Sequence, residues 1–98
     1  MSDQAIFKAL ADPTRRQILE DLRAGELTVG EICEGFDISG PAISRHLSVL
    51  KSAGLVHDRR DGSHVRYRLD DGRLALSVGG FLSTVCPTQV SVRRKRGK

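Results

Sequence analysis

Residues 39–53 constrain the fold more than any other stretch, because their pattern is that of a helix with one apolar face and one slim polar face. Ser39 fits the N-cap position, and Pro41 falls in the first turn, where its missing N–H leaves no hydrogen bond unmade. The apolar stripe recurs at helical spacing: Ile43, Leu47 and Leu50. The opposite face carries small or hydrogen-bonding side chains around one long cation: Gly40, Ala42, Ser44, Arg45 and Ser48. That face is slim enough to enter a DNA groove, although an ordinary amphipathic helix with a solvated polar face shows the same pattern.

A shorter helix is predicted directly before this one. Thr28 is followed three residues later by Glu31, which is the capping-box pattern, and the helix that it opens is expected over residues 29–35. Only the two-residue turn 37–38 separates this helix from the next cap. A short helix, a tight turn and a longer helix form the helix-turn-helix arrangement, whose second helix enters the major groove.

Two more helices are expected nearer the N-terminus. The first covers residues 3–10, and Asp12 can cap a second helix that has Pro13 at its first position. Gly25 is expected to end the second helix.

After Gly54 the pattern changes from helical to alternating, which predicts strands. Asp61-Gly62 lies between the two alternating runs and predicts a tight hairpin turn, because both residue types accept a positive φ. The tip and flanks of this hairpin are rich in cations and hydrogen-bonding groups: Arg59, Arg60, Ser63, His64, Arg66 and Arg68. The hairpin is therefore either a basic DNA-binding wing or simply a solvated charged hairpin.

The last helix is expected over residues 73–85, with an apolar stripe along it: Leu74, Val78, Phe81, Leu82 and Val85. The first helix has an apolar edge of its own: Ile6, Phe7 and Leu10. The middle helices and the wing already supply one core, so these two surfaces would stay partly exposed in a monomer. A two-fold dimer through the terminal helices covers them, while packing onto the same subunit is the alternative.

The 98-residue chain has a formal net charge of +4, but the distribution of the charges is more informative than their sum. Five of the sixteen basic residues lie in the last six positions, and without them the balance is eleven minus twelve, or −1. We therefore expect one domain over residues 1–88 and a basic, disordered tail over residues 89–98, which either binds phosphate or the minor groove or only aids solubility. Residues 45–73 hold seven basic and four acidic residues, which favours a phosphate-binding surface on the second half.

Several other classes of protein are excluded by what the sequence lacks. No apolar run approaches the roughly 20 residues needed to span a bilayer, and residues 1–10 do not resemble a signal peptide, so a cytoplasmic protein is expected. Cys33 and Cys86 are far apart, which favours buried or free thiols over a structural disulfide. No nucleophile with a plausible base, glycine-rich phosphate loop or cluster of metal ligands is present, so an enzyme is not expected.

Four segments carry a family resemblance that covers roughly residues 5–82: ALADPTRRQIL at 9–19, LTVGEI at 27–32, SGPAISRHLSVLKSAGLV at 39–56 and DGSHVRYRL at 61–69. In these segments the sequence resembles the ArsR family of bacterial winged-helix repressors. The resemblance implies a mainly α winged helix-turn-helix fold with five helices and a two-stranded wing. It also implies a homodimer that binds a palindromic operator in double-stranded DNA and represses its own or a neighbouring operon.

The family's base-reading positions fall at the start of the recognition helix, on Gly40, Pro41, Ser44 and Arg45. The first two have no side-chain hydrogen bonds to give, which leaves Ser44 and Arg45 as the main readers. The remaining candidates would contact the DNA backbone: Thr28, Ser39, His46, Arg59, Arg60, His64 and Arg66. For His46, packing beside Ile43 is the alternative to a phosphate contact.

Many relatives in this family sense metals, and here the sequence departs from them. The two thiolate positions of one metal site are occupied by Thr28 and Gly30, and residues 73–85 contain no histidine or carboxylate for the other. No metal and no cofactor is therefore expected, and the effector is left open. Two other readings also remain open: a winged-helix module that binds a protein partner, and a thiol-responsive repressor that uses Cys33 and Cys86.

Overall fold

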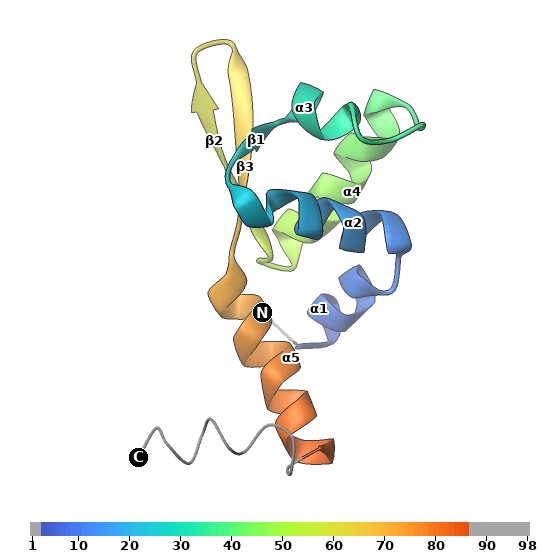
Figure 1. Cartoon of the computed structure of the whole chain (residues 1–98), viewed down its shortest axis with the longest axis vertical. Helices are drawn as coiled ribbons and strands as arrows, with labels where there is room; N and C mark the ends of the chain where they lie inside the picture. Colours follow the sequence, from blue (N-terminus) through green and yellow to red (C-terminus); the bar gives the residue numbers. More distant parts are fainter. Residues whose placement is uncertain (1–2, 87–98) are drawn as a thin grey trace.

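The computed structural model describes residues 3–86, so the predicted basic tail lies outside the described residues. The elements follow one another as α1 (Asp3–Leu10), α2 (Pro13–Asp21), a 3-10 turn η1 (Leu22–Ala24), β1 (Leu27–Thr28), α3 (Val29–Cys33), α4 (Gly40–Ser52), β2 (Val56–Asp61), β3 (His64–Leu69) and α5 (Asp71–Val85). Helices α1 to α4 form the body, the β2–β3 hairpin projects from one end, and α5 leads away at the other (Figure 1). The predicted fold, five α-helices with a β wing in a helix-turn-helix arrangement, is confirmed.

The core lies between the helices and the base of the sheet. The predicted apolar stripe of α4 is confirmed, because Ile43, Leu47 and Leu50 are fully buried. They pack in one cluster with residues from every element of the body: Ile6, Ala9, Ile18, Leu19, Leu22, Ile32, Ala53, Leu55 and Val56. Burial of one face leaves the opposite face of α4 in solvent.

The predicted helix caps are also confirmed. The Asp12 carboxylate accepts hydrogen bonds from the amides of Thr14, at 2.7 Å, and Arg15, at 3.2 Å. Thr28 and Glu31 form the complete capping box, and the Ser39 hydroxyl accepts from the Ala42 amide at 3.2 Å. Each side chain satisfies amides that the first turn of a helix leaves without an intrahelical partner.

Helix α3 is two residues shorter than predicted. It ends at Cys33, because the chain tightens there into i→i+3 hydrogen bonds. The amide of Gly35 donates to the Ile32 carbonyl at 3.1 Å, and the amide of Phe36 donates to the Cys33 carbonyl at 3.0 Å.

The wing is part of a three-stranded antiparallel sheet in the order β1-β3-β2, so the prediction of a two-stranded wing was incomplete. Strand β1 pairs Leu27 with Tyr67 and Thr28 with Arg66. Two residues are too few to show an alternating pattern, and only the tertiary contact with β3 makes them a strand.

The hairpin turn is shifted by one residue from its predicted place. Asp61 is the last residue of β2 and pairs with His64, so Gly62 and Ser63 form the two-residue loop. Among residues 3–86 no residue other than glycine has a positive φ, and Gly62 has a φ of 65°. Glycine at the first loop position matches the hairpin twist, and Asp61 need not leave the strand.

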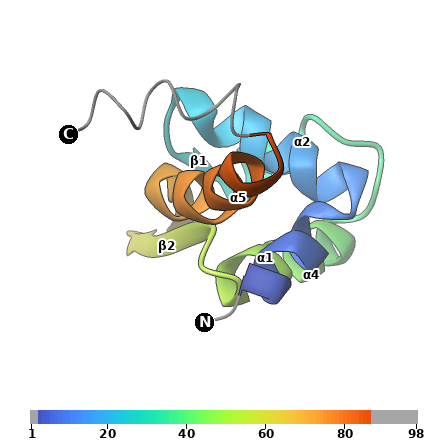
Figure 2. The same ribbon diagram turned by 90° about the horizontal axis from the view of Figure 1, so that it is seen from below.

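Helix α5 begins two residues earlier than predicted, because Asp70 caps it by accepting a hydrogen bond from the Arg73 amide at 2.9 Å. None of its residues is fully buried. Its contact with α1 includes the rings of Phe7 and Phe81, which meet edge to face with centroids 5.6 Å apart. Figure 2 looks along α5 and shows α1 lying beside α4.

Candidate nucleic-acid interface

The exposed face of α4 presents the residues predicted to read bases. Ser44 and Arg45 are both exposed, and neither side chain has a hydrogen bond or ion pair with any residue in 3–86. Gly40 and Pro41 are exposed in the first turn, next to the capping Ser39. The first turns of α4 therefore offer a hydroxyl and a guanidinium on a helix whose opposite face is fixed in the core.

His46 is half buried on the flank of α4, and its position shows a partner that the sequence reasoning missed. Its Nδ1 lies 3.2 Å from Nη1 of Arg15 in α2. A guanidinium has only donors, so Nδ1 must accept, and the neutral ring then has its proton on Nε2. The hydrogen bond from Arg15 therefore holds His46, and its Nε2–H has no partner in the described residues.

Arg15 also holds the end of α1. Its Nε donates to the Ala9 carbonyl at 2.7 Å, and its Nη2 donates to the Lys8 carbonyl at 3.2 Å. Arg16 donates to the Leu10 carbonyl at 2.7 Å. The carbonyls at a helix C-terminus lack intrahelical partners, and cations there are favoured. The sequence contained a signal for these contacts, because Arg15 and Arg16 closely follow the helix that ends at Leu10.

The register of the hairpin divides the wing into two faces, since side chains of directly paired residues lie on the same face. One face carries four largely apolar side chains together with Asp58 and Arg60: Val56, Asp58, Arg60, Val65, Tyr67 and Leu69. The other is polar throughout: His57, Arg59, Asp61, His64, Arg66 and Arg68. The wing residues predicted to bind DNA therefore do not share one face, because Arg60 lies opposite the others.

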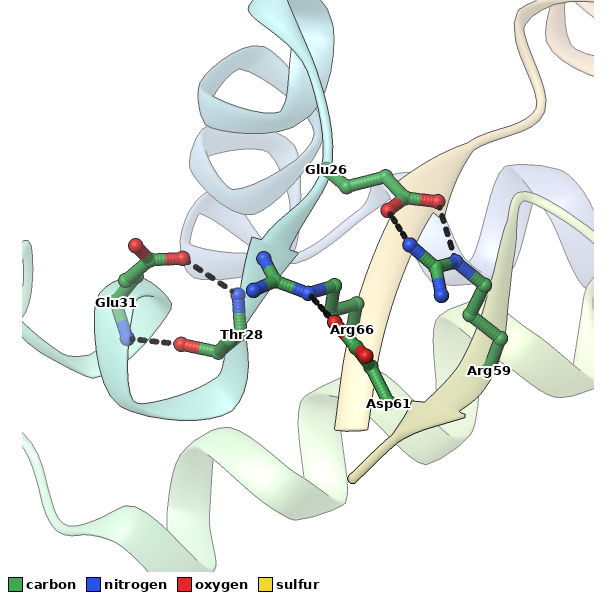
Figure 3. Close-up of polar contacts among 6 residues, drawn as sticks. All are labelled: Glu26, Thr28, Glu31, Arg59, Asp61 and Arg66. Atoms are coloured by element: carbon green, nitrogen blue, oxygen red, sulfur yellow. Dashed lines mark hydrogen bonds and ion pairs between the residues drawn. The ribbon is translucent and has the colours of Figure 1, made fainter. Parts of the chain in front are cut away.

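Two of the predicted wing residues are held by carboxylates. The Arg59 guanidinium binds Glu26 through two hydrogen bonds, from Nε at 3.1 Å and from Nη2 at 2.8 Å (Figure 3). Nε of Arg66 donates to Asp61 Oδ2 at 2.7 Å. These hydrogen bonds lower the pKa of the Glu26 and Asp61 carboxyls below their ordinary values. Arg60, by contrast, is exposed and has no partner in the part of the chain that the structure describes.

Thr28, another candidate phosphate contact, is half buried and engaged in the capping box. Its hydroxyl accepts from the Glu31 amide at 3.1 Å, and its own amide donates to Glu31 Oε1 at 2.8 Å. The Thr28 amide and, to a smaller extent, the Thr28 side chain hydrogen-bond the Glu31 carboxylate and lower the pKa of that group. Both the amide and the hydroxyl of Thr28 are therefore engaged, and Glu31 adds a negative charge beside them.

In the described part of the chain, the cysteines and other metal-binding side chains do not gather into a site. Both thiols are free, with Cys33 half buried against the core and Cys86 exposed. Within residues 3–86 no three histidine, cysteine, aspartate or glutamate side chains lie close enough together to hold a metal ion. No helix in the same range is long and apolar enough to cross a bilayer.

Comparison with known proteins identifies the family. Residues 12–58 match the model of the bacterial regulatory protein, arsR family. The chain is 44% identical over 80 residues to the transcriptional repressor SdpR of Bacillus subtilis, covering 82% of this chain and 89% of that protein. It is 49% identical over 74 residues to the HTH-type transcriptional regulator Rv2034 of Mycobacterium tuberculosis, covering 76% and 69%.

Solved structures agree with this result. An ArsR-like transcriptional regulator from Rhodococcus superposes with a TM-score of 0.76 at 27% identity, covering 97% of this chain and 87% of that one. The matched sequence contains the whole helix-turn-helix, including the exposed turns of α4. The chain therefore belongs to the ArsR family of bacterial regulatory proteins, which are DNA-binding transcriptional regulators and not enzymes.

Proposed function

We propose that this chain is a homodimeric repressor that binds a palindromic operator of its own or a neighbouring operon in the cytoplasm. Helix α4 enters the major groove and reads bases through Ser44 and Arg45, and the wing contacts the DNA backbone through Arg60. The observation that carries the proposal is the unpartnered, exposed Arg45 on a helix whose opposite face is completely buried. An arginine in that place can bind O6 and N7 of guanine together.

The exposed surface also favours nucleic acid over a protein partner. A protein-binding version of this helix and wing would present aromatic rings, which are enriched at protein interfaces. In residues 3–86 the exposed aromatic rings are Phe7 and Phe81, on α1 and α5, and Tyr67 of the wing is half buried. Arginines, not aromatic rings, therefore mark the α4 and wing surfaces.

Exposed apolar side chains on the terminal helices support the dimer. On α5, Phe81 is 52% exposed, Leu82 41% and Val85 55%, and on α1 Phe7 is 38% exposed. Contact with a second copy would remove this apolar surface from water. A two-fold axis between the terminal helices would present two α4 helices to the two halves of a palindrome.

The predicted dimer residues need one correction. Ile6 is only 1% exposed and belongs to the core of its own chain, because α1 packs against α2, α4 and α5. Leu10 and Leu74 are half buried against the same core. Of the predicted dimer residues, Phe7, Val78, Phe81 and Leu82 therefore remain for a partner, and Val85 is also exposed.

The test of the reading helix is Arg45→Ala, measured on the chain's own promoter DNA and on a scrambled duplex. We expect a loss of about 1–3 kcal/mol on the promoter and a much smaller loss on scrambled DNA. Arg23→Ala removes the same charge from an exposed position in η1 and is the matched control. An equal loss on both duplexes would show that Arg45 binds phosphate and does not read bases.

The test of the dimer is Phe81→Glu, compared with wild type by sedimentation at several protein concentrations. We expect a dimeric wild type, a monomeric variant and loss of promoter binding, because a carboxylate cannot be buried unpaired in an apolar interface.

Zinc or a chelator should leave promoter affinity unchanged, because Thr28 and Gly30 stand where metal-sensing relatives have thiolates. A monomeric wild type, or an affinity that follows zinc, would contradict the proposal.

A further inference from the structure

Arg59 and Arg66 are directly paired across β2 and β3, so two cations lie side by side on the polar face of the wing. Like charges in this position destabilise a sheet. Here each guanidinium has its own carboxylate: Glu26 for Arg59 and Asp61 for Arg66. The carboxylates thus relieve a repulsion that the register of the hairpin creates.

The two ion pairs are built from different parts of the chain. Glu26 stands just before β1, 33 positions from Arg59, and binds it in the parallel two-bond geometry that makes arginine–carboxylate pairs strong and specific. Asp61 and Arg66 are neighbours across the hairpin turn, and Thr28 faces Arg66 from β1 (Figure 3). The missed strand β1 therefore brings Glu26 to the wing.

A bound carboxylate takes one or two of the five N–H donors of a guanidinium and neutralises its charge, which weakens the attraction of that guanidinium to a DNA phosphate. Arg45 and Arg60 have no such partner within the described chain. We propose that Glu26 and Asp61 are specificity-determining residues, an inference that rests on the proposed function. By pairing with Arg59 and Arg66, they lower the affinity of these two arginines for the phosphates of random DNA.

The physical reason is that phosphate contacts supply nearly all of non-specific binding, whereas base contacts supply sequence preference. On random DNA, an arginine without a carboxylate partner can bind any phosphate within its reach. On the operator, Ser44 and Arg45 fix the position of the wing, so the same arginine adds less binding free energy. Pairing the two arginines with carboxylates therefore lowers the affinity for random DNA more than the affinity for the operator.

The test uses Glu26→Gln and Asp61→Asn, which keep the side-chain shape and remove the charge. On scrambled DNA we expect each variant to bind about three- to tenfold more tightly near 0.1 M salt, with a salt slope steeper by about 1. The gain on promoter DNA should be smaller, so the specificity ratio falls. Glu20→Gln, an exposed carboxylate on α2, makes the same change in net charge and should leave the slope unchanged.

A second pair of variants tests whether the effect passes through the arginine. Arg59→Gln alone should change scrambled-DNA affinity by less than about twofold, since Glu26 already neutralises the charge of Arg59. In the Glu26→Gln background the same substitution should abolish the gain in scrambled-DNA affinity. Three results would overturn the proposal. The first is a gain in scrambled-DNA affinity no larger than that of Glu20→Gln, and the second is an equal gain in affinity on both duplexes. The third is a large loss of scrambled-DNA affinity for Arg59→Gln alone. Failure of the proposed function would appear separately, as a wild type with no preference for promoter DNA.

Discussion

Replacing Arg15 by alanine removes the side chain that joins the end of α1 to the flank of α4. Arg15 lies on α2, and its guanidinium contacts the carbonyls of Ala9 and Lys8 and the Nδ1 atom of His46. Hydrogen bonds that involve a charged group contribute about 1.5–3 kcal/mol each when buried, and less when exposed. The Ala9 bond is short and partly buried, and the Lys8 bond is longer and exposed, so we expect Arg15→Ala to lower the free energy of unfolding by about 2–3 kcal/mol.

The measurement is thermal unfolding at one fixed protein concentration, because the stability of a dimer depends on concentration. For a chain of this length, each kcal/mol corresponds to roughly 4–8 °C in Tm. Arg16→Ala is the matched control, because it removes the same charge and one exposed hydrogen bond to the last carbonyl of α1. We expect it to cost less than about 1 kcal/mol.

A second readout follows from the donor chemistry of Arg15. In wild type the neutral His46 ring should have its proton on Nε2, which long-range proton–nitrogen NMR spectra report directly. Arg15→Ala frees the ring to exchange its tautomers, whereas Arg16→Ala leaves the spectrum unchanged. Equal Tm values for the two variants, or a His46 ring protonated on Nδ1 in wild type, would refute the link between α1 and α4.

Three further predictions concern stability. Gly54→Ala should destabilise by about 1–2 kcal/mol in urea unfolding, because its φ is 81°, a left-handed conformation that strains residues with a Cβ; a neutral effect would contradict this. Leu47→Ala should cost about 2–5 kcal/mol in the same assay, since Leu47 is fully buried, and a cost below 1 kcal/mol would show that the core collapses around the cavity. The hydrogen bond from His57 lowers the pKa of Asp70 in the folded state. Ionised Asp70 therefore stabilises the fold at pH values above its unfolded pKa of about 3.9. This stabilisation is lost as the pH falls through the lower pKa that Asp70 has in the folded state. The Tm difference between wild type and Asp70→Asn should therefore shrink between pH 6 and pH 2, and a constant difference would exclude the carboxylate as its cause.

Local signals were sufficient for most of the fold. The caps at Asp12, Thr28 and Ser39 depend on side chains within three residues of the amides that they satisfy, so the sequence itself contains both partners. The apolar stripe of residues 39–53 likewise depends only on helical spacing. These local features predicted the helix-turn-helix and the exposed face that carries Ser44 and Arg45, and the structure confirms both the arrangement and the exposure.

Only the tertiary structure decided which predicted site residues are available. Arg59 and Arg60 are adjacent and chemically identical, and strand alternation alone puts them on opposite faces. Only the fold brings Glu26, 33 positions away, to bind Arg59 and leave Arg60 without a partner in the described residues. Ile6 and Phe7 are also adjacent, and one is in the core while the other is exposed. Short-range patterns determine helices, caps and turns because their hydrogen bonds close within a few residues. Exposure and ion pairing depend on segments that meet only when the chain folds, and no local pattern reports them.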